Sequence, residues 1–381
     1  MPAYMAGREK QIVDAEGYLE SVQMRYPQQS MIYYGLRGVG KTVLLNTIEN
    51  AADNRNILYT HIEASEKVKF SARIVGAVGR FLHEISTKEA AKDFVRKCTS
   101  ILKAFTVTYK IDDGTFGVEL NQEASFTTGI YADDLTEVFV SLGKACLKSD
   151  DTICIFIDEV QYLSAEEIGG LVAAIHRCNQ LRLPVLLLCA GLPKILKTIG
   201  EARSYSERLF KFEPVGPLNR IESTAAITEP AKDYGVKYSP DAIDRIVELT
   251  SGYPYFIQEM CSSVWTSADE TKVLSLNDVK HAEPKFFQNL DEGFFAVRYN
   301  RCTKGEKDFI IAMVRCGQLP CTISNVAKMM GRTVKSISPC RGQLINKGMI
   351  YATSHAEIDF TVPQFSDYIR RINPKLEETL D

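Results

Sequence analysis

Short apolar runs alternate with longer amphipathic segments through residues 1–217. Strand-like runs occur at Met31–Tyr34, Asn56–Ala64, Thr152–Leu163 and Leu183–Ala190. Between them, apolar residues recur near a period of 3.6, which is typical of helices that bury one face. Strands that alternate with helices predict an α/β fold with a doubly wound parallel sheet, whose ligand site lies at the carboxyl ends of the strands.

The pattern changes after residue 217. Residues 218–299 are helical by periodicity and predict a small helical lid domain followed by a linker. Residues 300–372 predict three helices and then a β-hairpin, which is the order of a winged helix-turn-helix. Residues 373–381 form a tail.

Residues 104–120 interrupt the α/β pattern. Phe105 and Val107 alternate with polar neighbours, Asp113-Gly114 supplies a turn, and apolar residues alternate again from Phe116. This pattern predicts a β-hairpin inserted between helices. A surface elaboration and a contact with a partner both explain such an insertion.

A glycine-rich segment lies between the first predicted strand and a helix-like run that begins at Val43. Its residues Gly35-Leu36-Arg37-Gly38-Val39-Gly40-Lys41-Thr42 fit the pattern GxxxxGK[ST]. Glycines let the backbone N–H groups point at phosphate oxygens, and the helix N-terminus adds a positive field. Lys41 would reach the β- and γ-phosphates of a bound nucleotide, and the Thr42 hydroxyl would ligate Mg²⁺. The segment therefore predicts a nucleotide site with Mg²⁺.

A second nucleotide motif ends the apolar run that starts at Thr152. Asp158 and Glu159 follow it at the carboxyl edge of a predicted buried strand. Asp158 would hold Mg²⁺ through water, and Glu159 would orient and deprotonate the attacking water. Solvated acids are common at strand ends, but the combination with a phosphate loop indicates hydrolysis.

Charge is unevenly distributed along the chain. The net charge is −3, whereas Asn300–Ile372 contains eleven Lys/Arg and five Asp/Glu, a local excess of +6. The remainder therefore carries −9. A basic C-terminal module on an acidic body favours nucleic acid as a partner of that module.

The ten cysteines include no CxxC pair. Cys316 and Cys321 are close in sequence, and a zinc site is therefore one interpretation, but no matching His/Cys pair follows them. Buried thiols in a reducing cytosol explain the pattern better. No apolar run approaches the length of a membrane span, so we expect a cytoplasmic protein that does not contact a membrane.

From about Gly7 to Ile372, the chain resembles the AAA+ ATPases, in the branch that joins origin-recognition-type initiators, archaeal ATPases and STAND ATPases. Gly7-Arg8-Glu9 resembles the N-terminal box near the adenine, and Gly35–Thr42 resembles Walker A. Ile157-Asp158-Glu159 with Gln161 resembles Walker B, and Gly252-Tyr253-Pro254 resembles the GxP motif of the STAND lid, where Pro254 would contact nucleotide. The resemblance implies ATP as the ligand and ATP hydrolysis as the activity.

Two expected groups are missing from this resemblance. The sensor 1 position offers Cys189, Ala190 and Gly191, and the lid segment around Pro254 has no Arg or Lys for sensor 2. Fewer groups then stabilise the charge of the transition state, so we expect a slowly hydrolysing switch. An aromatic-Gly pore loop is also missing, which disfavours a polymer-threading motor.

The segment Tyr205–Phe212 resembles the region that carries an arginine finger, with Arg208 first and Arg203 second as the finger. A finger would imply ATP sites shared between subunits of a homo-oligomer. A salt bridge or aromatic stacking explains such an arginine equally well.

If Thr333–Asn346 enters a major groove of double-stranded DNA, its polar residues become base or phosphate contacts. Those candidates are Thr333, Lys335, Ser336, Ser338 and Gln343, with Arg332 and Arg341 on the backbone and His355 at the wing tip. A winged helix that docks a protein or supports the lid is the alternative.

Three functions follow from these features. The first is an ATP switch that acts on DNA. The second is a STAND-like signalling or anti-phage defence ATPase whose effector is a separate polypeptide. The third, a remodelling motor, is disfavoured because the pore loop and the sensor residues are missing.

Overall fold

The computed structural model describes residues 4–65, 67–111, 127–202, 206–268, 272–354 and 356–376. The chain divides into two compact units. The sheet unit comprises Arg8–Gly35 and Lys41–Val215, and the second unit comprises Met1–Gly7, Leu36–Gly40 and Gly216–Asp381. Among the residues described, no helix combines the length and the apolar character that crossing a membrane requires.

The sheet unit is built on five parallel strands in the order β2-β3-β4-β1-β5. Their bounds are β1 Ser30–Tyr34, β2 Leu58–Glu63, β3 Ile153–Asp158, β4 Val185–Gly191 and β5 Phe210–Pro214. Every residue of β3 and of β4 is buried, as expected for central strands covered on both faces. The predicted doubly wound parallel sheet is confirmed.

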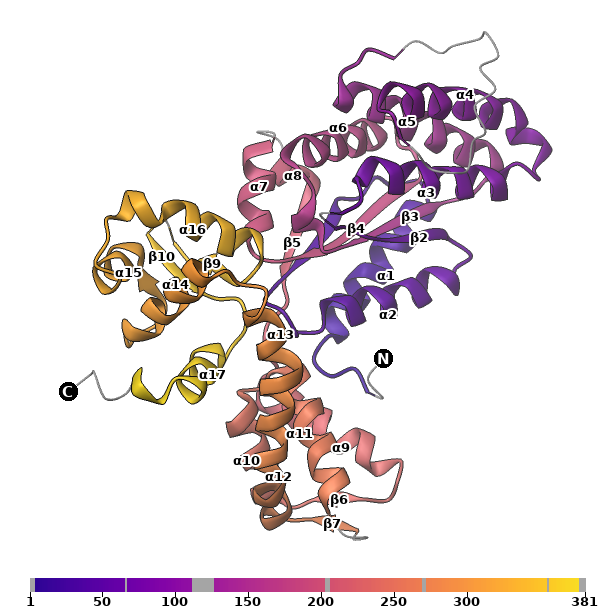
Figure 1. The fold of residues 1–381 in the computed structure, drawn as a ribbon. Helices are drawn as coiled ribbons and strands as arrows, with labels where there is room; N and C mark the ends of the chain where they lie inside the picture. Colours follow the sequence, from indigo (N-terminus) through magenta and orange to yellow (C-terminus); the bar gives the residue numbers. More distant parts are fainter. Residues whose placement is uncertain are drawn as a thin grey trace. The chain divides into compact units, whose positions relative to one another are not determined.

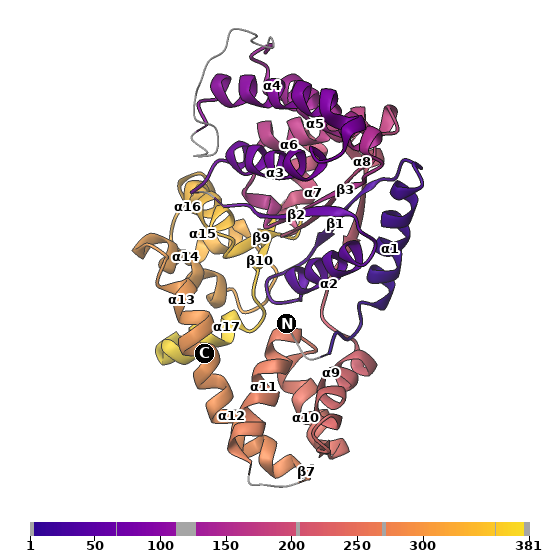
Figure 2. The same ribbon diagram turned by 90° about the vertical axis from the view of Figure 1, so that its right-hand side faces the viewer.

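Helices cover both faces of this sheet (Figures 1 and 2). Helices α1 and α2 lie on one face, α3, α5 and α6 lie on the other, and α4 packs outside on α5. Their bounds are α1 Glu9–Gln23, α2 Lys41–Asp53, α3 Phe70–Ile85, α4 Lys92–Thr108, α5 Tyr131–Ser149, α6 Ala165–Gln180, α7 Lys194–Ala202 and α8 Ser206–Leu209. Short 3-10 turns form at Glu89–Ala91 and Val160–Tyr162.

The hairpin predicted at residues 104–120 is wrong in its first arm. Residues 104–108 form the last turn of α4. Cys98, Ile101, Leu102 and Phe105 are buried at helical spacing, whereas Val107 is exposed. Alternation over so few positions fits a helix as well as a strand, and burial of one helical stripe decided between them. Residues 112–120 of the predicted hairpin lie outside the described part of the chain.

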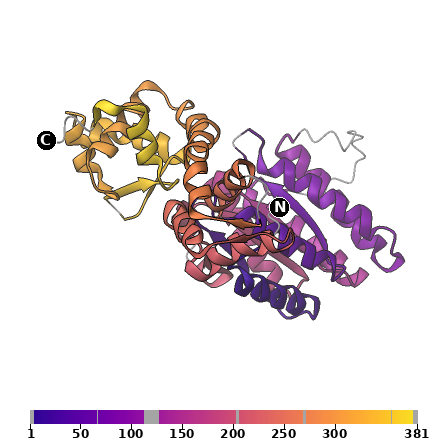
Figure 3. The same cartoon turned by 90° about the horizontal axis from the view of Figure 1, so that it is seen from below.

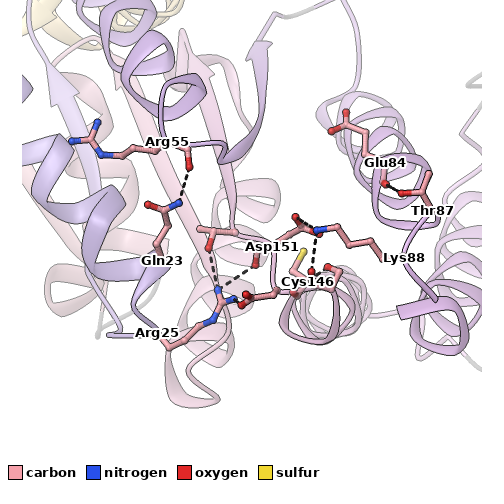
Figure 4. A network of polar contacts seen from close by, with 11 residues as sticks. Gln23, Arg25, Arg55, Glu84, Thr87, Lys88, Cys146 and Asp151 are labelled. Carbon is pink, nitrogen blue, oxygen red and sulfur yellow. Dashed lines mark hydrogen bonds and ion pairs between the residues drawn. The ribbon is translucent and has the colours of Figure 1, made fainter. Parts of the chain in front are cut away.

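A polar network ties the end of α1 to the loop before β3 (Figure 4). Arg25 donates through Nη1 to the Asp151 carbonyl at 3.2 Å and the Thr152 hydroxyl at 3.0 Å. Its Nη2 pairs with Asp150 at 2.7 Å. Lys88 donates to the Asp151 carboxylate at 2.7 Å. The network therefore holds the start of the strand that ends at Asp158.

We expect Arg25→Ala to lower the free energy of unfolding by about 1–2 kcal/mol, because partly buried acceptors lose a charged donor. Urea denaturation measures this change. Arg96→Ala is the matched control, since Arg96 pairs with Asp93 on the exposed face of α4 and such pairs contribute little. Equal losses in the two variants would contradict a structural role of the network.

The second unit contains two parts along the chain. Its first elements are α9 Arg220–Lys232, β6 Lys237–Tyr238, α10 Pro240–Thr250, α11 Pro254–Ser267, β7 Val273–Leu274, α12 Leu276–Asn289, the π-helix Leu290–Phe295 and α13 Ala296–Tyr299. They are followed by α14 Lys304–Arg315, β8 Cys321–Thr322, α15 Ile323–Met329, α16 Val334–Asn346, β9 Ile350–Ala352, β10 Glu357–Phe360, α17 Phe365–Ile372 and the 3-10 turn Pro374–Leu376.

Residues 304–372 combine helices with a three-stranded antiparallel sheet in the order β8-β10-β9 (Figure 3, orange to yellow). The hairpin of β9 and β10 matches the predicted one, and β8 adds a strand that the sequence did not indicate. Aromatic rings at Phe294, Phe295, Phe365 and Tyr368 pack continuously from the π-helix to α17. This arrangement is compatible with a winged helix.

Candidate functional site

The glycine-rich segment forms the turn between β1 and α2. Gly38 and Gly40 have φ values of +83° and +92°, a region that residues with a Cβ rarely adopt. Lys41, the first residue of α2, is 8% exposed, and its Nζ donates to the Gly35 carbonyl at 2.9 Å. The buried ammonium is thus held at the base of the loop.

Thr42 and Asp158 come together in the sheet unit although 116 positions separate them. The Thr42 hydroxyl donates to Oδ2 of Asp158 at 2.5 Å. Oδ1 of Asp158 accepts the N–H of Glu159 at 2.7 Å, and the Asp158 side chain is buried. A hydroxyl and a carboxylate are hard oxygen donors, and Mg²⁺ typically takes few protein ligands besides water and phosphate. The two residues therefore fit a Mg²⁺ ion that accompanies a nucleotide.

Glu159 follows β3 in the left-handed conformation, with φ 53° and ψ 35°. A residue other than glycine in this region costs about 1–3 kcal/mol and often marks a functional site. Its carboxylate accepts a hydrogen bond from Nε2 of Gln161. Gln161 belongs to the segment that resembles Walker B, but the sequence assigned it no role of its own at the site.

The end of β4 presents Cys189, Ala190 and Gly191 beside β3 and β1. Burial, and then the negative charge of Asp158, raise the pKa of the Cys189 thiol far above its ordinary value. Cys189 therefore stays protonated at neutral pH and does not supply a charged group.

The loop tip, Leu36–Gly40, belongs to the second unit, together with the predicted lid residue Pro254. The Gly38 carbonyl accepts the N–H of Tyr255 at 3.3 Å, and an added Cβ at Gly38 would lie 3.2 Å from the ring of Tyr253. Pro254 begins α11 between these two tyrosines. The Gly252-Tyr253-Pro254 turn thus packs on the loop tip within this unit.

The remaining nucleotide candidates lie around α1, α2 and α8. Gly7 has φ +66° and lies against Glu222, whereas Arg8 is the residue immediately before α1 and is 5% exposed. Glu9 is exposed in the first turn of α1, and Val43 is half-buried in α2. Arg208 is exposed on α8, where its carbonyl accepts Nε2 of Gln29 at 2.8 Å. Arg203 lies outside the described residues.

Most of the candidates for DNA contact lie on α16 or just before its first residue. The exposed ones are Arg332, Thr333, Lys335, Ser336, Ser338 and Gln343. Arg341 is half-buried, and His355 lies outside the described residues. Thr333 caps α16 by accepting the N–H of Ser336 at 3.3 Å, and Ser336 donates to the Thr333 carbonyl at 2.8 Å. The hydroxyls of Thr333 and Ser336 are therefore already hydrogen-bonded to the backbone at the start of α16.

Comparison with known proteins supports an ATPase. Residues 4–188 match the family model of an AAA ATPase domain. Residues 292–369 match a domain of unknown function, DUF8462. No curated protein is significantly similar to the chain in sequence.

Three solved structures illustrate the similarity in fold. The Walker-type ATPase Paby2304 of Pyrococcus abyssi has a TM-score of 0.55 and 14% identity, over 96% of each chain. Orc1 of Aeropyrum pernix, solved in complex with DNA, has a TM-score of 0.48 and 15% identity, over 100% of this chain and 96% of Orc1. The RuvB Holliday junction branch migration motor of Thermotoga maritima has a TM-score of 0.45 and 14% identity, over 96% of this chain and 95% of RuvB.

The Pyrococcus abyssi protein shares the fold of this chain, and the two scores below 0.5 support no further conclusion. The buried lysine of the glycine-rich loop, the Thr42–Asp158 pair at the ends of α2 and β3, and the matched family model agree with one another. The protein is an ATP-hydrolysing enzyme, and its residues 4–188 match an AAA ATPase domain.

Proposed function

We propose that this ATPase is a slowly hydrolysing molecular switch that acts on double-stranded DNA through a winged helix in residues 304–372. The observation that carries the proposal is the charge of this module. Residues 309–356 contain six Lys/Arg and no Asp/Glu. An excess of positive charge in such a stretch attracts the phosphate backbone of DNA.

The basic side chains of this stretch are mostly available to a ligand. Lys347 is engaged with buried Glu306 at 2.7 Å and so supports the fold. The other five are exposed or half-buried: Arg315, Lys328, Arg332, Lys335 and Arg341. Arg332 and Lys335 flank the start of α16, the end of a recognition helix that contacts base edges in helix-turn-helix proteins. We therefore assign α16 as the recognition helix.

In the same proposal, Gly35–Thr42 bind the phosphates of ATP, and Thr42 and Asp158 hold Mg²⁺. Glu159 is the general base for the attacking water. The end of β4 and the Pro254 segment lack the usual sensor side chains, which supports slow hydrolysis. Arg208, exposed on α8, completes the site of a neighbouring copy in a homo-oligomer that forms with ATP.

Fluorescence anisotropy with a labelled random duplex tests DNA binding, with and without Mg²⁺-ATP. We expect Arg332→Ala/Lys335→Ala to weaken binding about 10-fold or more. We also expect the slope of log affinity against log salt to become shallower by about 1.8, since each phosphate contact contributes about 0.9. Lys280→Ala/Lys285→Ala removes two exposed charges from α12 and is the matched control. Equal losses in both variants would contradict recognition by α16.

A signalling or anti-phage defence ATPase with a separate effector chain is the second candidate. The observation that favours it is a hydrogen bond from the N–H of Arg37, in the loop tip, to the carbonyl of Thr361 at the end of β10. Such a contact suits a module that restrains the nucleotide loop in a resting state. Absence of DNA binding in both nucleotide states would favour this candidate.

A further inference from the structure

Gln161 is a buried amide between the carboxylate of Glu159 and the end of β4. It lies in the 3-10 turn that follows Glu159 and is 6% exposed. Its Oε1 accepts the N–H of Leu192 at 2.9 Å, and its Nε2 donates to Oε2 of Glu159. Because a main-chain N–H can only donate, Leu192 determines which end of the amide is the oxygen, and the NH₂ group faces the carboxylate.

Gly191 provides the space that this amide needs. A Cβ at Gly191 would lie 2.8 Å from Oε1 of Gln161 and 2.8 Å from Cγ1 of Val160. The Gly191 carbonyl also accepts the N–H of Gly35 at 3.1 Å. The end of β4 thus contacts both the first residue of the phosphate-binding loop and the amide that holds Glu159.

We infer that Gln161 is a positioning residue for Glu159 in ATP hydrolysis. Its amide links the Glu159 carboxylate to the main chain at the end of β4, where the side chains of Cys189 and Ala190, and Gly191, provide no such hydrogen bond. A general base works only within hydrogen-bond reach of the proton that it takes. A glutamate side chain has several rotatable bonds, and a donor held at its other end by Leu192 restricts them. A carboxylate has two oxygens, so one can accept from Gln161 while the other accepts from water.

This inference rests on the proposed role of Glu159 as the base. Gln161→Met is the first test, because methionine has a similar length and lacks both hydrogen-bonding groups. We expect kcat to fall about 10-fold or more, since small misplacements of a catalytic group are costly, while the Kd of ATP changes less than about 2-fold. A kcat within about 2-fold of the wild type, or a higher one, would overturn the inference.

Gln180→Met is the matched control, because Gln180 is exposed at the end of α6 in the same unit. It should leave kcat and Kd unchanged. A double-mutant cycle then separates positioning from a structural role. If Gln161 acts by positioning Glu159, then adding Gln161→Met to Glu159→Gln should not lower the residual kcat any further. A general structural defect would instead lower kcat by the same factor in the wild type and in Glu159→Gln.

Gln161→Glu tests the same contact if Gln161→Met does not fold. It keeps an acceptor for Leu192 but replaces the donor to Glu159 with a second carboxylate, so repulsion between like charges takes the place of the hydrogen bond. We expect kcat to fall about 10-fold or more, while the Kd of ATP changes less than about 2-fold. A kcat within about 2-fold of the wild type would overturn the inference. Normal turnover by Glu159→Gln alone would instead refute the role of Glu159.

Discussion

Lys41→Ala should abolish tight binding of ATP. Lys41 is 8% exposed and its Nζ lies 2.9 Å from the Gly35 carbonyl, at the base of the loop between β1 and α2. Removing a buried cation that faces phosphate charge costs about 3 kcal/mol, which corresponds to a loss of affinity on the order of 100-fold. Alanine favours helix, so the start of α2 is not expected to unfold.

Equilibrium titration with a fluorescent ATP analogue measures this effect in the presence of Mg²⁺. Lys97→Ala is the control, because Lys97 is an exposed lysine on α4 of the same unit. It should bind the analogue as the wild type does. If Lys41→Ala binds with the affinity of the control, the phosphates do not contact this lysine, and the proposed binding site at Gly35–Thr42 is wrong.

Glu159→Gln should bind ATP normally and fail to hydrolyse it. The substitution preserves the volume and one oxygen acceptor for Gln161, but it removes the base. Loss of a general base typically lowers the rate of the chemical step by about 10²–10⁴-fold. A bound but unhydrolysed ATP would also trap any assembly that ATP promotes, which sedimentation can detect.

Phosphate release and analogue titration together separate hydrolysis from binding. Glu137→Gln is the control, since Glu137 is exposed on α5. It should leave both measurements unchanged. Near-normal phosphate release by Glu159→Gln would show that another group orients the water. A parallel loss of ATP affinity would show instead that the substitution disturbs Asp158, which accepts the Glu159 N–H at 2.7 Å.

The fold class was predictable because its signals are local. The buried strands β3 and β4 are continuous apolar runs, and the loop after β1 is a contiguous motif of glycines with Lys41 and Thr42. Local signals failed where the same apolar positions fit both the helical period of 3.6 and the strand period of 2. Phe105 and Val107 fit a strand as well as a helix, and burial of the stripe that Phe105 forms with Cys98, Ile101 and Leu102 selects the helix.

The sequence by itself determined the parallel α/β core, the phosphate-binding loop and the acidic end of β3, since each depends on neighbouring residues in one short segment. Only the tertiary structure decided which of these groups meet. Thr42 contacts Asp158 because α2 and β3 converge at the carboxyl edge of the sheet. Gln161 reaches Leu192 because Gly191 has no side chain. Contacts between distant segments depend on strand order and on local space, which periodicity and motif spacing do not encode.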